Sequence, residues 1–517
     1  MLSVLSSHAP IGIEGQVVSV EVDIRRGLPG IEIVGLPDGA VRESRERVRI
    51  SIRNSGFVFP PERITVNLAP AGLRKEGASF DLPIALGVLA ASQQVERPED
   101  GRIMVLGELN LSGRVRPVSG VLSAVGCGHA LGLSRFLVPL ENLKEARSLG
   151  VGSVHGIGSL RQAADIVTAL ARGETIAQGD PPQERISAFP APESGDLEEI
   201  RGHESLKRSL EVAAAGRHHV LLFGPPGSGK TMAARRLPSL LPELSRQESL
   251  EVTRIHSVAG LLGPGAGLIV RPPMRAPHHT ASIEGIVGGG RAMRPGEASL
   301  AHHGVLFLDE TPEFGSNLLQ GLREPIEEGW ISIARAGSTV RYPAEFQLIL
   351  ACNPCPCGNL GRDEKSCTCT PEEVSRYWRR MGGALLDRID LRLPLSPVPV
   401  DVMASPAPPS GTAERLRRVR EAVRVQRLRY QGRPFSCNAR IPAAAMESFC
   451  PLSMACRKAL VDAGRTVCLS SRAFHSVIRV ARTIADLEGA AEIAENHVLE
   501  AAQYRRYGDG DWFWIRA

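Results

Sequence analysis

Long apolar runs are missing from this 517-residue chain, and so is a secretion signal. No stretch approaches the roughly 18 consecutive apolar residues of a membrane-spanning helix, and Met1–Pro10 shows no charged segment followed by an apolar one. Lysine is also scarce, because 55 of the 61 basic residues are arginine. The first two absences argue against a membrane or secreted protein, and we expect a cytoplasmic chain without a membrane partner.

The remaining composition is that of an ordinary globular protein, with 43% hydrophobic and 23% charged residues. At about 100–200 residues per domain, the length predicts roughly three units. The net charge of +5 says little by itself. Arginine suits bidentate phosphate contacts, but a GC-rich genome that favours arginine codons explains its excess as well. The ten cysteines of a cytosolic chain should be reduced, so clusters among them indicate metal binding rather than disulfides.

A phosphate-binding loop is the most specific feature of the chain. The apolar run Val220–Phe223 predicts a buried strand, and a glycine-rich octet follows it directly. In such a loop, glycines let backbone N–H groups face phosphate oxygens, the lysine reaches the terminal phosphates, and the last hydroxyl binds Mg²⁺. We predict that the whole octet binds ATP: Gly224, Pro225, Pro226, Gly227, Ser228, Gly229, Lys230 and Thr231.

A second predicted strand, Val305–Leu308, ends in two acids, Asp309 and Glu310. At this position Asp309 is expected to hold Mg²⁺ together with Thr231, and Glu310 to orient and polarise the attacking water. Acids often follow strands, so the pair gains its weight from the phosphate-binding loop upstream. Together the two motifs predict hydrolysis of the nucleotide rather than binding alone.

Two stretches rich in proline, glycine and polar residues predict linkers at 172–196 and 394–412. They divide the chain into an N-terminal mixed α/β domain (1–171), a central domain (197–393) and a helical C-terminal domain (413–517). In the central domain strands and helices alternate, as a parallel sheet requires. The predicted fold class is therefore α/β and multidomain, and no internal repeat is detected.

The order of the central motifs resembles the AAA+ ATPases, which carry a helical lid after the parallel sheet. In that family the strand after the acidic pair ends in a polar residue that senses the γ-phosphate. The segment Phe346–Asn353 matches this pattern, so the resemblance assigns the sensor role to Asn353. Residues 469–472 resemble the second sensor on the lid, which assigns that role to Arg472.

Residues 385–390 resemble the arginine-finger region of the same family, with Arg388 as the finger. Such a guanidinium stabilises the charge that spreads over the γ-phosphoryl oxygens during hydrolysis. A finger acts on the ATP of the next subunit, so the resemblance implies a ring, expected to be a homo-hexamer. The plain alternative is a local ion pair of Arg388 with Asp387 or Asp390.

Two insertions resemble those of the magnesium-chelatase branch of AAA+ proteins, where insertions face the pore of a ring. The first, 251–304, contains His278 and His279; adjacent histidines rarely coordinate one ion well, so a hydrogen-bonded structural or pore role is favoured. The second, 329–341, alternates around a Gly-Ser pair and predicts a β-hairpin with Arg335 near its tip. Arg335 and Arg341 are candidates for DNA contact, or simply solvated charges.

The N-terminal segments 75–82 and 107–118 resemble the Lon protease domain. That resemblance places a serine nucleophile at Ser79 and its lysine base near Leu122, but no lysine occurs between Lys75 and Lys144. A serine needs an activating neighbour to act as a nucleophile. We therefore expect a Lon-like fold without peptidase activity.

Four cysteines lie close together after Asn353, as the pairs Cys355/Cys357 and Cys367/Cys369. Four thiolates on two turns joined by a short loop can form a tetrahedral Zn²⁺ site. The spacing of one residue within each pair is less usual than two, and free thiols in a loop are the alternative. We predict a structural zinc site.

A Lon-like domain followed by a magnesium-chelatase-type AAA+ module, over essentially the whole chain, resembles the ComM/YifB family. The resemblance implies a hexameric DNA helicase that promotes branch migration during natural transformation, with single-stranded or branched DNA as its partner. The arginine-rich helix predicted at 414–431 fits nucleic acid or a solvated lid face equally. Because pore loops also grip peptides, a remodeller of protein complexes remains an alternative, as does a chelatase-type motor subunit.

Overall fold

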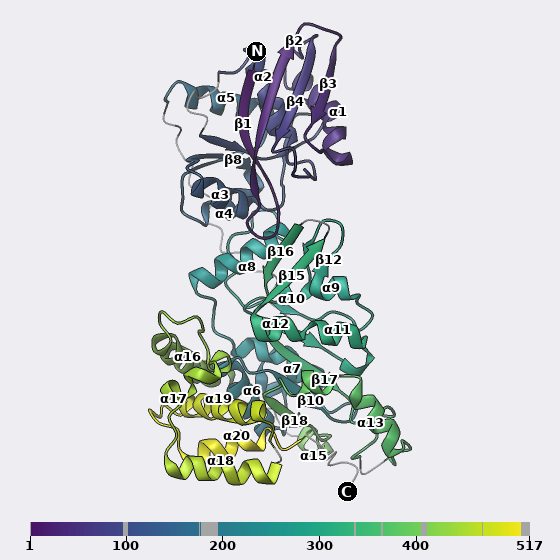
Figure 1. Cartoon of the computed structure of the whole chain (residues 1–517), viewed down its shortest axis with the longest axis vertical. Coiled ribbons are helices and arrows are strands. Elements are labelled where there is room, and N and C mark those ends of the chain that lie inside the picture. Colours follow the sequence, from purple (N-terminus) through teal and green to yellow (C-terminus); the bar gives the residue numbers. More distant parts are fainter. Residues whose placement is uncertain are drawn as a thin grey trace.

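The computed structural model describes residues 2–96, 102–174, 176, 195–335, 338–362, 365–404, 411–467 and 469–507. Three blocks are arranged along its long axis (Figure 1). The N-terminal block forms one end, the central block occupies the middle, and the C-terminal helices lie beside the central block at the other end. None of the described helices is long and apolar enough to cross a membrane.

The N-terminal block is built on a mixed seven-stranded sheet. Its strands are β1 (Leu2–Ala9), β2 (Gln16–Arg25), β3 (Gly30–Val34), β4 (Arg63–Ala69), β5 (Ile103–Val105), β8 (Arg135–Pro139) and β9 (Ser153–Ile157). They follow the order β3-β4-β2-β1-β5-β8-β9, with antiparallel pairing of β1 to β2 and of β2 to β4 and parallel pairing elsewhere. Val18, Val20 and Val22 alternate into the core, which explains why β2 forms a strand with one buried face.

Five helices and a small two-stranded ladder complete this block. They are α1 (Gly39–Asn54), α2 (Asp81–Ala91), α3 (Val121–Ala130), α4 (Leu143–Arg147) and α5 (Leu160–Ala171), with β6 (Glu108–Leu109) paired to β7 (Val115–Arg116). The helix α2 is buried along nearly its whole length and packs against β1 and β2. These helices and strands confirm the mixed α/β structure predicted for this part of the chain.

The central block is built on a five-stranded parallel sheet. Its strands are β10 (Val220–Phe223), β11 (Met274–Arg275), β14 (Val305–Leu308), β17 (Gln347–Cys352) and β18 (Leu391–Pro394). Their order is β11-β14-β17-β10-β18. Every residue of β10, β14 and β17 is buried, because the sheet is covered on both faces, and this is why the three strands are continuous apolar runs. The predicted fold class is confirmed.

Helices and two small hairpins surround the central sheet. The helices are α6 (Glu204–Gly216), α7 (Lys230–Arg236), α8 (Arg246–Val258), α9 (Ile283–Val287), α10 (Glu297–Leu300), α11 (Ser316–Gly321), α12 (Arg323–Glu328), α13 (Pro371–Arg379) and α14 (Gly383–Leu386). The hairpins pair β12 (Gly288–Gly289) with β13 (Arg294–Pro295), and β15 (Trp330–Arg335) with β16 (Ser338–Pro343).

The second hairpin differs from the sequence prediction in its turn. Ser338 begins β16 and pairs with Arg335, so it belongs to the strand and not to the predicted Gly-Ser turn. Gly337 itself lies outside the described residues.

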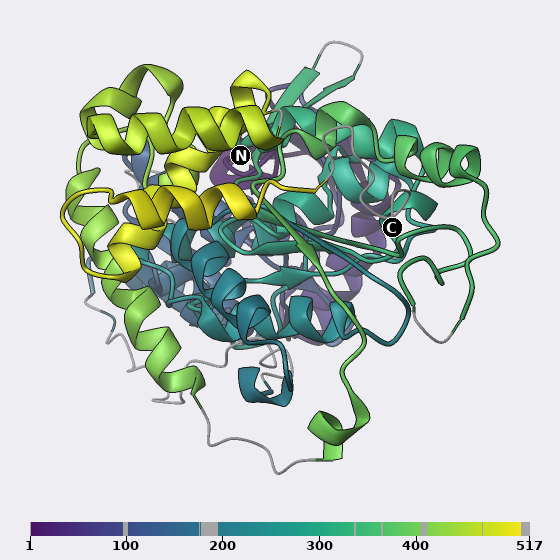
Figure 2. The same ribbon diagram turned by 90° about the horizontal axis from the view of Figure 1, so that it is seen from below.

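The C-terminal block is helical and packs against the central block. Its helices are α16 (Thr412–Arg429), α17 (Met446–Phe449), α18 (Met454–Val467), α19 (Ser471–Leu487) and α20 (Glu495–Gln503). The helix α6 of the central block contacts both α16 and α19, and one apolar cluster spans the two blocks. From below, the C-terminal helices gather along one side of the central sheet (Figure 2).

The predicted linkers have different outcomes. Most of 172–196 lies outside the described residues. The other, 394–412, is not a plain linker, because it contains the short helix α15 (Val400–Ala404) and the buried residue Leu395. Further single turns of 3₁₀ helix connect the elements, at Leu140–Asn142, Leu197–Glu199, Leu237–Leu240, Thr311–Glu313, Asn438–Arg440 and Ala443–Ala445.

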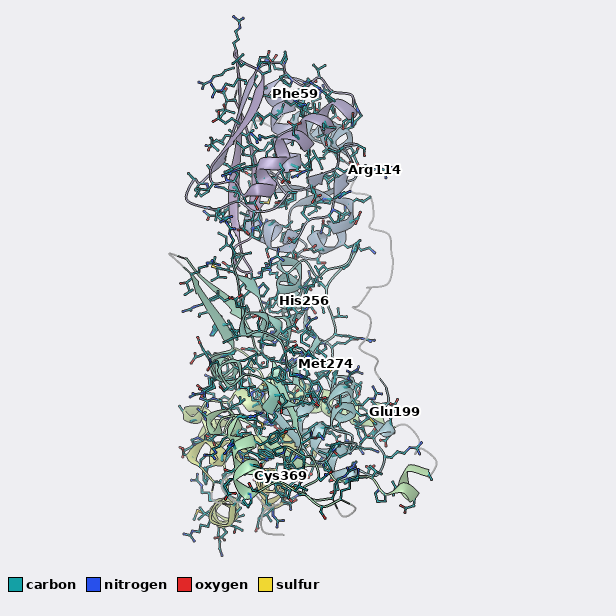
Figure 3. All side chains as sticks on the ribbon, turned by 90° about the vertical axis from the view of Figure 1, so that its right-hand side faces the viewer. Phe59, Arg114, Glu199, His256, Met274 and Cys369 are labelled. Atoms are coloured by element: carbon teal, nitrogen blue, oxygen red, sulfur yellow. The ribbon has the colours of Figure 1, made fainter. Side chains whose placement is uncertain are left out.

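The N-terminal block joins the central block through α8, which packs on α3. At this seam the buried carboxylate of Glu145 accepts hydrogen bonds from the Leu122 N–H at 2.9 Å, from Asn142 Nδ2 at 3.1 Å and from the Ser257 hydroxyl of α8. Burial raises the pKa of Glu145. Figure 3 labels His256, the neighbour of Ser257, midway between Phe59 at the N-terminal end and Cys369 at the other.

Candidate functional site

The phosphate-binding loop and its partner motifs meet at one edge of the central sheet. Because β17 lies between β10 and β14 and all three run parallel, their carboxyl ends lie side by side. The residues that follow these three ends are Gly224, Asn353 and Asp309. Ligands of open parallel sheets bind outside this edge, so the sheet order places the predicted nucleotide residues together.

The backbone of the loop requires glycine at particular positions. Gly227 and Gly229 have φ angles of 82° and 85°, in the left-handed region that glycine adopts without strain. A Cβ at Gly224 would lie 2.2 Å from the carbonyl oxygen of Leu395, so only glycine fits where the chain after β18 closes over the loop. The helix α7 begins at Lys230, directly after the loop, and the N–H groups at the start of a helix favour a bound phosphate.

Lys230 is buried inside the loop. Its Nζ donates to the carbonyl oxygens of Gly224 at 2.7 Å and Pro225 at 3.0 Å, and to Oδ1 of Asn353 at 3.2 Å. Burial lowers the pKa of the Lys230 ammonium group. Since the polar end of Asn353 reaches this lysine, the predicted sensor lies beside the predicted phosphate-binding cation.

The predicted magnesium ligands are in direct contact. Thr231 Oγ1 donates to Asp309 Oδ2 at 2.7 Å. A hydroxyl and a carboxylate oxygen are ligands that Mg²⁺ accepts, so the two residues fit a Mg²⁺ held by Thr231 and, through water, by Asp309. The next residue, Glu310, has a left-handed φ of 50°, and its N–H donates to Asp309 Oδ1 at 2.9 Å. Such a conformation is uncommon outside glycine and is found at functional sites.

A histidine of the first insertion contacts Glu310. His279 Nδ1 lies 3.5 Å from Glu310 Oε2, and His278 Nδ1 lies 2.9 Å from Thr280 Oγ1. These contacts agree with the hydrogen-bonded role favoured for the histidine pair. The contact between His279 and Glu310 was not predicted from the sequence, because the two residues lie in segments that only the tertiary fold brings together.

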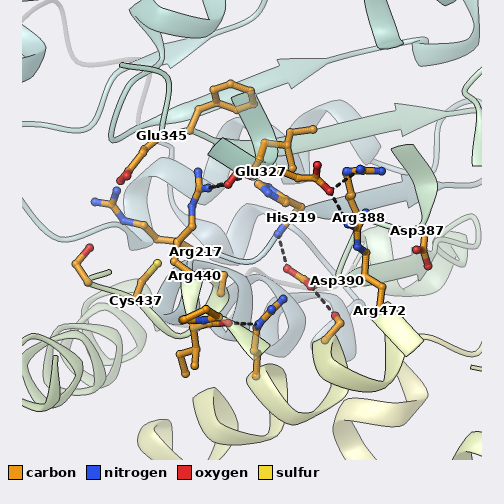
Figure 4. A pocket seen from close by; sticks show the side chains of 18 residues that line it. Arg217, His219, Glu327, Glu345, Asp387, Arg388, Asp390, Cys437, Arg440 and Arg472 are labelled. Atoms are coloured by element: carbon orange, nitrogen blue, oxygen red, sulfur yellow. Dashed lines mark hydrogen bonds and ion pairs between the residues drawn. The ribbon is translucent and has the colours of Figure 1, made fainter. Parts of the chain in front are cut away.

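Arg388 and Arg472 lie together, away from the phosphate-binding loop. The Nη2 atoms of both donate to Oε1 of Glu327, each at 2.5 Å (Figure 4). They line a cavity of about 290 Å³. Among the described residues that line this cavity, none belongs to the octet 224–231.

The alternative partners of Arg388 bind other groups. Asp387 Oδ1 accepts a hydrogen bond from Ser470 Oγ at 2.7 Å, and Asp390 Oδ1 accepts one from Ser476 Oγ at 2.5 Å. The local ion pair considered from the sequence is therefore not formed. The carboxylate that Arg388 contacts belongs to Glu327, an exposed acid that no sequence motif singles out.

The four clustered cysteines converge. The Sγ atom of Cys355 lies 3.4 Å from that of Cys357 and 3.7 Å from that of Cys367, and the last two are 3.6 Å apart. Together with Cys369, all four sulfur atoms lie within 4.8 Å of one another. Tetrahedral Zn–S bonds of about 2.3 Å place sulfur atoms about 3.8 Å apart, so this set fits a closed structural zinc site.

The cysteine cluster abuts the nucleotide residues. A Cβ at Gly358, within the cluster, would lie 3.0 Å from the ring of Pro226 and 3.9 Å from the amide carbon of Asn353. Burial disfavours the Cys357 thiolate, but backbone N–H groups of Asn359 and Thr368 and the neighbouring thiols lower the pKa of Cys357 to about 6. A thiolate at this position is the form that binds metal.

The predicted DNA-contact residues lie on the hairpin β15–β16. Arg335 and Arg341 are both exposed, and Arg341 pairs in register with Ser332. A Cβ at Gly12 would lie 2.7 Å from Val340 Cγ1, so the hairpin also touches the β1–β2 turn of the N-terminal block. Their contact with DNA stays a prediction.

The residues considered for peptidase activity do not form a serine–lysine pair. Leu122, near which a lysine base was expected, is an apolar residue with no exposed surface. Lys75 is buried and donates from Nζ to the carbonyl oxygen of Pro70, while Ser79 is half-buried. The Lon-like character of the block remains an expectation.

Known sequences match this chain along most of its length. The family described as magnesium chelatase, subunit ChlI, matches residues 196–403; subunit ChlI of Mg-chelatase matches 20–142; and the subunit ChlI C-terminal family matches 410–505. The chain is 42% identical over 506 residues to an uncharacterized protein of Mycobacterium tuberculosis, covering 97% of this chain and 98% of the relative.

Two further relatives match over nearly their whole length. One is the uncharacterized protein YifB of Escherichia coli, 40% identical over 509 residues, with 98% of this chain and 97% of the relative covered. The other is the competence protein ComM of Haemophilus influenzae, 37% identical over 506 residues, with the same coverage.

The parallel sheet, the glycine-rich loop and the ChlI matches define a magnesium-chelatase-type AAA+ ATPase. The relatives that share its full length narrow this class. The chain belongs to the ComM/YifB family, as the sequence resemblance predicted.

Proposed function

We propose that the chain is the subunit of an ATP-hydrolysing ring, a homo-hexamer, that moves on DNA and promotes branch migration during uptake and recombination. The proposal of a site shared between subunits rests on the positions of Arg388 and Arg472. These two arginines lie together in a cavity apart from the chain's own phosphate-binding loop. Two arginines placed in this way suit the γ-phosphate of ATP bound to a neighbouring subunit.

In the proposed mechanism, the octet 224–231 binds the phosphates, and Thr231 and Asp309 hold Mg²⁺. Glu310 orients the attacking water and accepts its proton. Asn353, which contacts Lys230 at 3.2 Å, is positioned to sense the γ-phosphate. The neighbour's arginines stabilise the negative charge that develops on the transferred group.

The proposed division of labour follows the predicted domains. The central domain (197–393) carries the phosphate-binding loop and Arg388, and the helical domain (413–517) contributes Arg472. The N-terminal domain (1–171) serves assembly and DNA contact rather than peptide hydrolysis. The N-terminal and central domains meet at α8 and the buried Glu145. This joint supports transmission between the DNA-binding and ATP-binding parts of the chain.

The choice of DNA as the cargo rests on two further points. The chain is related over its full length to a protein named for competence. The exposed arginines of the hairpin β15–β16, Arg335 and Arg341, suit sequence-independent contact with DNA phosphates.

We also propose that Cys355, Cys357, Cys367 and Cys369 hold a structural Zn²⁺, which the spacing of their sulfur atoms supports.

The test is the ATPase rate with and without single-stranded and forked DNA, together with DNA binding at low salt, where phosphate contacts are strongest. We expect stimulation by DNA. The double variant R335A/R341A should keep the basal rate and lose the stimulation. A matched control, R457A/R465A, removes two exposed arginines from α18 and should behave as the wild type. An ATPase that binds no DNA at low salt and responds to none would refute the DNA motor.

A further inference from the structure

A single carboxylate oxygen holds both arginines of the proposed shared site. Oε1 of Glu327 accepts from Arg388 Nη2 and from Arg472 Nη2, each at 2.5 Å. The side chain of Arg388 is 9% exposed, whereas those of Glu327 and Arg472 are 40% and 41% exposed. The bridge therefore lies at the rim of the cavity, where an arriving anion can replace the carboxylate.

The charges at this bridge do not balance. Two guanidinium groups share the Glu327 carboxylate, and around the whole cavity the five arginines outnumber the four acids by one charge: Arg217, Arg388, Arg440, Arg472 and Arg479 against Glu327, Glu345, Asp387 and Asp390. Burial and the nearby Arg472 lower the pKa of Arg388. Burial opposes ionisation of Glu327, but the charges of Arg388 and Arg472 nevertheless lower its pKa. The site thus suits an anion with more charge and more oxygen atoms than one carboxylate, such as a terminal phosphate.

Glu327 is also connected directly to the hairpin that carries Arg335. It lies in the last turn of α12; Gly329, with a φ of 78°, ends this helix, and β15 begins at Trp330. From the helical block, Arg440 Nη1 donates to the carbonyl oxygen of Ile326 at 2.9 Å. A displacement of the hairpin therefore acts on the helix that positions the Glu327 carboxylate.

We propose that Glu327 is an internal ligand that competes with the neighbour's γ-phosphate for Arg388 and Arg472. When the neighbour binds ATP, its phosphate replaces the carboxylate and both guanidinium groups transfer to it. DNA on the hairpin weakens the internal bridge and so favours this exchange. The inference rests on the shared site proposed above, and it assigns to Glu327 a regulatory role that the motifs do not contain.

The test compares Glu327→Gln with the matched control Glu328→Gln, which changes the next, exposed acid of the same helix. Loss of the competing charge should lower the apparent KM for ATP by about three- to tenfold. It should also shift ATP-dependent ring assembly to lower ATP concentrations, while kcat stays within about twofold of the wild-type value. DNA should lower the KM of the wild type and leave that of Glu327→Gln unchanged. Glu327→Asp, which withdraws the carboxylate, should change KM in the same direction by less.

Two results would overturn the inference. The first is a KM and an assembly curve of Glu327→Gln equal to those of Glu328→Gln. The second is a loss of kcat as large as that of Arg388→Ala, because the carboxylate would then position the arginines rather than compete for them. Failure of the shared site itself is recognised separately, since Arg388→Ala would then keep the wild-type kcat.

Discussion

Removing the Arg388 guanidinium tests the shared nucleotide site most directly. In Arg388→Ala, kcat for ATP should fall while the subunit still binds ATP, because Arg388 lies in a cavity that contains none of the described loop residues 224–231. Binding depends instead on the loop, where Lys230 and its acceptors remain intact. The expected change is therefore in kcat and in the KM of the assembled ring, and not in the affinity of the isolated subunit for nucleotide.

The magnitude follows from how the two arginines are arranged. A full arginine finger contributes about 10³- to 10⁵-fold to phosphoryl transfer. After the substitution Arg472 remains, and it already reaches the same carboxylate oxygen as Arg388, so part of the stabilisation persists. Loss of two hydrogen bonds to a charged group costs about 3–4 kcal/mol, which corresponds to a fall in kcat of about 10²- to 10³-fold.

The assay mixes inactive subunits. Arg388→Ala keeps Glu310, and Glu310→Gln keeps Arg388, so rings that contain both should regain activity where an intact arginine meets an intact glutamate. The matched control is Arg417→Ala, which removes an exposed arginine of α16 and should leave kcat unchanged. A wild-type kcat of Arg388→Ala, or no recovery at any mixing ratio, would refute a finger that acts between subunits.

Further substitutions test the phosphate-binding loop, the cysteine cluster and the joint between the N-terminal and central blocks. Lys230→Ala should weaken binding of a fluorescent ATP analogue by about 10- to 100-fold, whereas Glu310→Gln should bind it normally and hydrolyse ATP about 10²- to 10⁴-fold more slowly. Metal analysis of protein purified without chelators should find about one zinc per chain, reduced in Cys357→Ser but not in the control Cys127→Ser, and a wild-type protein without zinc would contradict the site. Burial raises the pKa of Glu145, so its contribution to stability is fully present below the ordinary carboxyl pKa and is lost as pH rises through the raised value. The melting temperature of the wild type should therefore fall between pH 4 and pH 8 by more than that of Glu145→Gln, and equal falls in the two proteins would rule this out.

The nucleotide residues could be predicted from the sequence because each signal is local. A strand buried on both faces must be apolar throughout, and the bounds of β14 coincide with the predicted Val305–Leu308. Glycines with left-handed φ and a lysine at the start of a helix likewise follow from the loop pattern. The parallel sheet order then brings Asp309 and Asn353 to the same edge as the loop.

The relation between the arginines could not be predicted in this way. Arg388 follows the short helix α14, whereas Arg472 lies in the first turn of α19, and their approach depends on how the helical block packs on α6. Glu327 is an exposed acid on a six-residue helix, a pattern that normally indicates a solvated charge. The contact between His279 and Glu310 likewise depends on the tertiary fold and could not be predicted from either local sequence. Partners brought together by tertiary packing leave no periodic signal.

The apolar cluster that spans the central and helical blocks limits how one chain can change shape. Val220 and Leu222 of the sheet belong to the same cluster as Val477 and Ile484 of α19. Close-packed interiors resist opening, because separating the blocks would expose this shared surface to water. The central and helical blocks of one chain should therefore move together as one rigid piece, with the phosphate-binding loop and the paired guanidinium groups at separate places on it. The hinges of a working ring would then lie at the joints between neighbouring chains.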